Sequence, residues 1–284
     1  MINQYRIHNK FLDVRIHRKG AELCSVKNTD QFEFIWQAGP VWQRHAPNLF
    51  PIVGSLLDHE YSYNSKITQL THHGFARDLE FDVLHQSEHS ICFILQQNQD
   101  TLESYPFDFT LLITYTLNEN TLEQTFRVMN KDNKRMPVSF GGHPAFNVHA
   151  IYEYEIQFEC NEDVQANTLE GPYISDSKVD VIKGNKIPLD HHTFDWDALV
   201  FQDLKSDWVK LVHKSSSHAV KVDIRDFPHL GIWSKPGAPF VCIEPWQGMA
   251  DLVSHNKDIL QKKGVLVLES NEEVLKTFKM EFTS

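Results

Sequence analysis

Apolar and polar residues alternate along most of the chain with a period of two. This period is typical of strands that bury one face, because successive side chains point to opposite sides of a sheet. The segments that show this pattern or a short apolar run, each predicted to be a strand, are Leu12–Ile16, Phe32–Trp36, Leu79–Leu84, Ser90–Leu95, Phe107–Leu117, Thr121–Met129, Tyr154–Phe158, Asp197–Phe201, Trp208–His213, Ala219–Arg225, Leu230–Trp233, Phe240–Ile243, Gly264–Leu268 and Val274–Phe282.

Helical periodicity is weak everywhere except at Lys257–Lys263, the one segment predicted to be helical. Residues 56–71 are polar and are predicted to form turns, and residues 160–195 are predicted to form a long loop with short extended pieces. Many strands at short spacing with few short helices indicate an all-β fold, and their number indicates a large sandwich. Since no linker or change of composition divides the chain, we expect residues 1–284 to form a single domain.

The chain is acidic, with a formal net charge of −11 and no run of lysine or arginine. This charge argues against nucleic acid or an anionic membrane as the main partner. The first residues are polar, and no stretch approaches the ~20 apolar residues of a membrane span, so we expect no secretory signal and no membrane partner. The four cysteines are scattered in or near apolar runs, which is typical of reduced, cytoplasmic proteins.

The first candidate for chemistry is Glu244, which follows the apolar run Phe240–Ile243 and precedes Pro245 and Trp246. Proline removes a backbone donor, so we expect regular strand pairing to stop at Glu244. A carboxylate at the mouth of a buried strand, beside an aromatic wall, suits a general base. The alternative is an edge-strand glutamate that meets solvent.

The second candidate is His143, which lies between Gly141-Gly142 and Pro144. Two glycines allow a close approach of backbone to a ligand or to a neighbouring strand. The proline keeps the histidine from pairing as an ordinary strand residue. The alternative to a functional role is a core or surface histidine whose hydrogen bonds are all made within the fold.

Further candidates surround these two. His73 and Arg77 offer an imidazole and a guanidinium around a glycine turn, and Asp197 stands at the start of a predicted strand; an ordinary loop and a simple turn are their alternatives. Residues 42–54 are apolar yet interrupted by prolines and a glycine, which is typical of a segment lining a cleft. Arg44 lies within this segment.

Taken together, His73–Arg77, Gly141–Asn147, Asp197 and Ile243–Trp246 resemble the aldose 1-epimerase (mutarotase) family, in its LacX-like branch. The resemblance implies a galactose mutarotase-like β-supersandwich with a sugar site on its concave face. It implies Glu244 as the base, His143 as the acid, and sugar contacts from His73, Asp197, Arg77 and Arg44. Relatives often carry arginine where this chain has Ser55, which leaves open whether Arg44 supplies that contact.

The chemistry implied by the resemblance needs no cofactor and no metal. A carboxylate takes the proton of the C1 hydroxyl while an imidazole protonates the ring oxygen, and the two roles reverse when the ring closes. Both groups serve neighbouring atoms of one ring, so we expect their functional atoms about 4–8 Å apart in an empty groove. Trp246 and Phe146 are the predicted apolar walls.

Other functions stay open at this stage. A glycoside hydrolase would use Asp197 and Glu244 as a carboxylate pair, but it has no special need for His143. A metal enzyme of the cupin type is disfavoured, because the chain has neither a His-x-His pair with a nearby glutamate nor a His-Glu-x-x-His helix. A non-catalytic sugar-binding protein and an epimerase of hexose phosphates are also compatible, as are a monomer and a homodimer.

Overall fold

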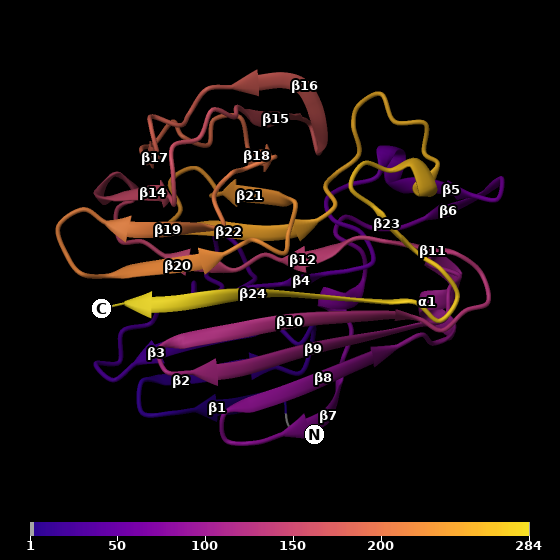
Figure 1. The fold of residues 1–284 in the computed structure, drawn as a ribbon, viewed down its shortest axis with the longest axis horizontal. Helices are drawn as coiled ribbons and strands as arrows, with labels where there is room; N and C mark the ends of the chain where they lie inside the picture. Colours follow the sequence, from indigo (N-terminus) through magenta and orange to yellow (C-terminus); the bar gives the residue numbers. More distant parts are fainter. Residues whose placement is uncertain (1–2, 284) are drawn as a thin grey trace.

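The computed structural model describes residues 3–283, and its two largest sheets are both antiparallel (Figure 1). The nine-stranded sheet has, in spatial order, β17 (Lys186–Pro188), β14 (Tyr154–Phe158), β19 (Trp208–His213), β20 (Ala219–Asp223), β24 (Glu273–Thr283), β10 (Thr121–Asn130), β9 (Phe109–Asn118), β8 (Ser90–Gln96) and β7 (Asp82–Gln86).

The eight-stranded sheet carries the groove described below. Its order is β16 (Tyr173–Val179), β15 (Ala166–Glu170), β18 (Leu199–Gln202), β21 (His229–Trp233), β22 (Phe240–Gln247), β12 (Phe140–Gly142) and β4 (Asn48–Leu49), with β13 (Ala145–Asn147) also paired to β22. Smaller sheets are formed by β1 (Gln4–His8), β2 (Leu12–His17) and β3 (Leu23–Asn28), by β5 (Glu60–Tyr63) and β6 (Lys66–Gln69), and by β11 (Met136–Val138) and β23 (Leu266–Leu268).

The predicted all-β sandwich is confirmed, but the predicted helix is not. Lys257–Lys263 contains only the 3₁₀ turn η4 (Ile259–Gln261), whereas the one α-helix of the described residues, α1 (Gln99–Ser104), begins at an Asn98–Thr101 capping box. The other 3₁₀ turns are η1 (Leu57–His59), η2 (Ala76–Asp78) and η3 (Ile151–Glu153). Within residues 3–283, no helix is both long and apolar enough to cross a membrane.

Several predicted boundaries also need correction. Phe32–Trp36 forms isolated bridges through Glu33 and Ile35 instead of a strand. Residues 56–71 and 160–195, predicted to be turns and loop, contain the β5–β6 hairpin and strands β15 to β17. Polar strands of this kind escape a pattern search, because their side chains bury little apolar surface.

Aromatic side chains fill the space between the two large sheets. Phe126 of β10 packs against both Phe278 of β24 and Phe140 of β12, Phe227 contacts all three rings, and all four are buried. The strict alternation of buried and half-buried residues in β10 turns this apolar face inward. The cluster therefore supports β12 immediately before His143.

Gly141 and Gly142 are required by this close packing. A Cβ atom at Gly141 would lie 2.4 Å from the carbonyl oxygen of Pro245, and one at Gly142 would lie 2.6 Å from Cζ of Phe278. Any larger residue would therefore push β12 away from β22 or from the nine-stranded sheet. The predicted role of the glycine pair in close backbone approach is confirmed.

Strand β22 does not end where the sequence predicts. It continues through Glu244 and Pro245 to Gln247, and Pro245 pairs with Leu230 of β21. On the other side of β22 the neighbouring strand is interrupted between β12 and β13, at His143 and Pro144. The register is the same on both sides of this interruption, with Gly141 opposite Trp246 and Ala145 opposite Cys242. It therefore places His143 directly opposite Glu244.

We expect Gly142→Ala to lower the free energy of unfolding by about 1–3 kcal/mol, the usual cost of overpacking a core. Phe278→Leu in the same chain should relieve part of this cost, so urea unfolding should give a double variant more stable than the sum of the single effects predicts. As a control, Gly142→Ala combined with Phe93→Leu in β8 should be additive. Additive effects in both pairs would contradict the proposed contact.

Candidate active site

A groove of about 870 Å³ opens on the eight-stranded sheet, and it collects side chains that are far apart in the sequence. Its lining includes five of the six predicted site residues, namely Glu244, His143, His73, Asp197 and Arg77. Arg44, the sixth, is not part of the lining. The apolar segment of residues 42–54 contributes Trp42, Gly54 and Ser55, as expected of a segment that lines a cleft.

The carboxylate of Glu244 and the imidazole of His143 lie in direct contact. Oε2 of Glu244 is 3.2 Å from Nε2 of His143, and their side chains are 1% and 10% exposed. The predicted separation of about 4–8 Å is therefore too long, because the strand register puts the two residues directly opposite each other. The predictions that both line one groove and that His143 lies outside regular pairing agree with the structure.

Burial shifts the proton affinities of this pair in opposite directions. It raises the pKa of Glu244 well above its usual value, and the nearby charge of Asp197 adds to the effect. Burial also lowers the pKa of His143 to about 3, helped by the positive charge of Arg77. Each group thus favours its neutral form, and in that state the pair holds one proton between its two members.

Aromatic rings hold the imidazole of His143 in place. Trp42 stacks on it with ring centroids 5.1 Å apart, and Trp233 meets it edge-on at 5.8 Å. Trp42, Trp233 and Trp246 line the groove. The predicted wall residue Phe146 is instead buried in the main core and does not line the groove. Successive side chains along a strand point to opposite faces of a sheet, and Phe146 points to the core face.

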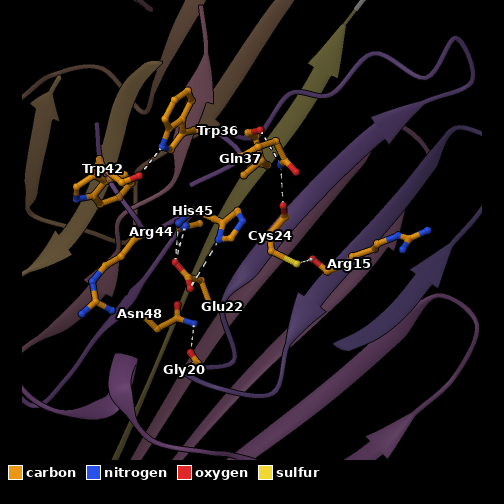
Figure 2. A network of polar contacts seen from close by, with 12 residues as sticks. Arg15, Gly20, Glu22, Cys24, Trp36, Gln37, Trp42, Arg44, His45 and Asn48 are labelled. Carbon is orange, nitrogen blue, oxygen red and sulfur yellow. Dashed lines mark hydrogen bonds and ion pairs between the residues drawn. The ribbon is translucent and has the colours of Figure 1, made fainter. Parts of the chain in front are cut away.

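A half-buried polar network positions the segment that carries Trp42 (Figure 2). The carboxylate of Glu22 accepts hydrogen bonds from the backbone N–H groups of His45 and Ala46, at 2.8 and 3.0 Å. The indole N–H of Trp36 donates to the carbonyl oxygen of Trp42 at 2.9 Å. Because these bonds satisfy the backbone of an irregular segment, they fix the ring that stacks on His143.

His73 presents a defined tautomer to the groove. Its Nδ1 accepts a hydrogen bond from the backbone N–H of Gly54 at 3.0 Å, so its proton is on Nε2, which is left to act as a donor. Next to it, Oγ of Ser55 lies 2.7 Å from Nδ1 of His72. The position where relatives often have arginine is therefore filled by a serine–histidine pair.

Asp197 reaches the groove from a tight turn. Its φ of 67° lies in the left-handed region, which aspartate tolerates better than most residues. It precedes β18 instead of starting it, and its backbone N–H donates to the carbonyl oxygen of Phe194 at 3.1 Å. Burial raises the pKa of its carboxyl, an effect that the nearby indole of Trp233 partly offsets.

The two predicted arginines share one carboxylate. Nη2 of Arg44 lies 3.0 Å from Oδ1 of Asp78, and Nε of Arg77 lies 3.7 Å from Oδ2. Arg77 also donates to the carbonyl oxygen of His72 at 2.7 Å. Burial and the neighbouring charge of Arg44 lower the pKa of Arg77 to about 10, so the side chain of Arg77 is cationic at neutral pH. The carboxylates of Asp78 and Glu22 both lie near enough to interact with this charge.

A buried ion pair holds together segments next to the groove. Nζ of Lys262 lies 2.6 Å from Oδ1 of Asp251, and both side chains are almost completely buried. Oδ2 of Asp251 accepts the backbone N–H of Leu57, and its carbonyl oxygen accepts that of Ile174. Asp251 thus joins three segments, and its neighbour Ala250 lines the groove.

The groove also gathers polar atoms that lack partners. Among the described residues, seven buried side-chain atoms make no hydrogen bond of good geometry, and four of them belong to groove residues. These four are Nε of Arg77, Nδ1 of His143, Oε2 of Glu244 and Nε1 of Trp246. Since an unsatisfied buried polar group is costly, their concentration indicates a site for a polar ligand.

Comparison with known proteins agrees with these features. The family model described as aldose 1-epimerase matches residues 3–264. The chain is 32% identical over 284 residues to the plasmid and the chromosomal LacX proteins of Lactococcus lactis subsp. lactis, an alignment that covers 90% of this chain and 91% of theirs.

Solved structures give the same result. A galactose mutarotase related enzyme from Lactobacillus acidophilus has a TM-score of 0.93 and 36% identity, covering 99% of this chain and 97% of that one. A galactose mutarotase-like protein from Lactobacillus casei ATCC 334 has a TM-score of 0.94 and 32% identity, covering 98% and 99%. The predicted galactose mutarotase-like sandwich is thereby confirmed, and the chain belongs to the aldose 1-epimerase family.

Proposed function

We propose that the groove interconverts the α and β anomers of an aldose, with Glu244 as the base and His143 as the acid. The observation that carries this proposal is the buried contact of 3.2 Å between a carboxylate and an imidazole in a groove lined by unpartnered polar atoms. Membership of the aldose 1-epimerase family supports an isomerase acting on a sugar.

The protons of the pair match those of the reaction. In the first step ionised Glu244 takes the proton of the C1 hydroxyl, protonated His143 gives a proton to the ring oxygen, and the bond between C1 and the ring oxygen breaks. The pair then holds one proton on Glu244 and none on His143, the distribution that burial favours in the empty groove. Rotation about the C1–C2 bond and reversal of these steps give the other anomer.

The remaining groove residues would hold the sugar. Nε2–H of His73 can donate to a hydroxyl, and Asp197 can accept from one. The apolar face of a pyranose ring suits the indole walls of Trp42, Trp233 and Trp246. No step of this scheme draws on a metal or an organic cofactor.

A phosphorylated hexose is a second candidate substrate, because Arg77 brings a guanidinium group to the groove. Its Nε lies 3.7 Å from Oδ2 of Asp78 but makes no hydrogen bond. A phosphate at that end of the groove would give this atom a hydrogen-bond partner. We expect Arg77→Met to raise the KM of a 6-phosphorylated hexose, measured by polarimetry, far more than that of the free hexose. An equal change for both sugars would favour a free aldose.

Glu244→Gln and His143→Asn should each fold normally and reduce kcat for mutarotation by roughly 10²–10⁴-fold, the usual contribution of a general acid or base. Polarimetry with a freshly dissolved α-anomer measures the rate, and circular dichroism checks the fold. Wild-type rates in a folded Glu244→Gln protein would exclude the mechanism. If wild-type protein bound sugar without accelerating mutarotation, it would be a sugar-binding protein, and cleavage of an aryl glycoside would indicate a hydrolase.

The pH dependence of kcat/KM should show an acid limb and an alkaline limb with a plateau between them. The acid limb reports a second proton on the pair and must lie below 6.5, because burial lowers the pKa of His143. The alkaline limb reports loss of the single proton and must lie above 4.5, because burial raises the pKa of Glu244. An acid limb with its midpoint at or above pH 6.5 would show that the imidazole titrates as an exposed one does.

A further inference from the structure

Cys242 places a thiol beside the acid–base pair. It lies two residues before Glu244 on β22, so both side chains project from the same face of the strand. The ligand atoms of His143, Cys242 and Glu244 all lie within 4.8 Å of one another, and all three residues are buried. The mutarotase scheme uses the carboxylate and the imidazole but gives the thiol no task.

We infer that His143, Cys242 and Glu244 form a binding site for a zinc-like divalent cation. Thiolate, imidazole and carboxylate are the three donor types that bind Zn²⁺, whereas Mg²⁺ requires an oxygen shell. The 3.2 Å between Nε2 of His143 and Oε2 of Glu244 is close to the edge of a tetrahedron with metal–ligand distances of about 2.0–2.1 Å. The sulfur of Cys242, within 4.8 Å of both atoms, would be the third ligand, which leaves one position of the tetrahedron open.

Two features of the cluster favour a cation. Oε2 of Glu244 is buried and, although it lies 3.2 Å from Nε2 of His143, makes no hydrogen bond of good geometry, so a cation would give this atom a strong partner. The thiolate of Cys242 and the carboxylate of Glu244 together balance the two positive charges of a dication, so the bound cluster carries no net charge in the buried site.

A second cluster is less suited to this task. His17, Glu22 and His45 also bring their ligand atoms within 4.8 Å, but they are only half-buried. One oxygen of Glu22 already accepts two backbone N–H groups, and its other oxygen lies 4.0 Å from Nδ1 of His45. This cluster has no thiol, so the two sites have different spectra when they bind Co²⁺.

Binding at the first cluster would stop catalysis, since the cation occupies the two atoms that must exchange protons with the sugar. This consequence rests on the proposed function, whereas the binding itself does not. Sugar and cation would compete for the groove, and a chelator would restore the mutarotation rate.

The test is a Co²⁺ titration of the reduced protein, followed by absorption spectroscopy. We expect a thiolate-to-cobalt charge-transfer band that saturates at one ion per chain, and displacement of Co²⁺ by Zn²⁺ but not by Mg²⁺. The band should persist in the Cys24→Ser/Cys92→Ser/Cys160→Ser variant and be lost in Cys242→Ala. Loss of the band in the triple variant, its survival in Cys242→Ala, or its absence from wild-type protein would overturn the proposal.

A second measurement separates this proposal from the proposed function. Calorimetric titration with Zn²⁺ in buffers of different ionisation enthalpy should show that binding releases protons at neutral pH, independent of any activity. Cys242→Ala, checked for folding by circular dichroism, should keep its mutarotation rate and lose its inhibition by Zn²⁺. Zinc binding without any mutarotation in wild-type protein would sink the proposed function alone, and mutarotation insensitive to Zn²⁺ would sink the metal site alone.

Discussion

The site depends on one feature of sheet pairing, the interruption between β12 and β13 opposite an unbroken β22. The interruption keeps the register, so the residue inside it, His143, meets Glu244 across the strands. If the strand were regular at this point, its side chains would pack against those of β22 and fill the space of the groove. Two glycines permit the close approach on one side, and Pro144 ends regular pairing on the other.

Burial also makes this contact suited to proton transfer. A lone ionised carboxylate in such a place would be costly, and so would a lone imidazolium. Holding one proton between two groups avoids both costs while keeping a donor and an acceptor in position. The hydrogen bonds of Glu22 and the buried ion pair of Lys262 and Asp251 hold in place the segments that form the walls of the groove.

Much of the site could be predicted from the sequence, because its residues occur in short, unusual contexts. Glycine before His143 and proline after both His143 and Glu244 are local signals, and the groove does contain these residues with His73, Asp197 and Arg77. The 3.2 Å contact could not be predicted, since it follows from a register between strands about 100 residues apart. The predicted end of β22 is wrong, because a proline inside a strand is tolerated where the neighbouring strand is interrupted. That interruption lies in a distant part of the sequence. Trp42 was missed because only tertiary contacts bring it over His143.

The central claim is that the buried pair of Glu244 and His143 holds one proton at neutral pH. The most direct test is to follow both groups in the sugar-free protein, using ¹⁵N chemical shifts for the ring of His143 and the infrared carboxyl band for Glu244. We predict a neutral imidazole and a protonated carboxyl at pH 7, with both signals lost in the corresponding Asn and Gln variants. An ionised Glu244 beside a neutral His143 at that pH would contradict the account, because the pair would then have no proton to give.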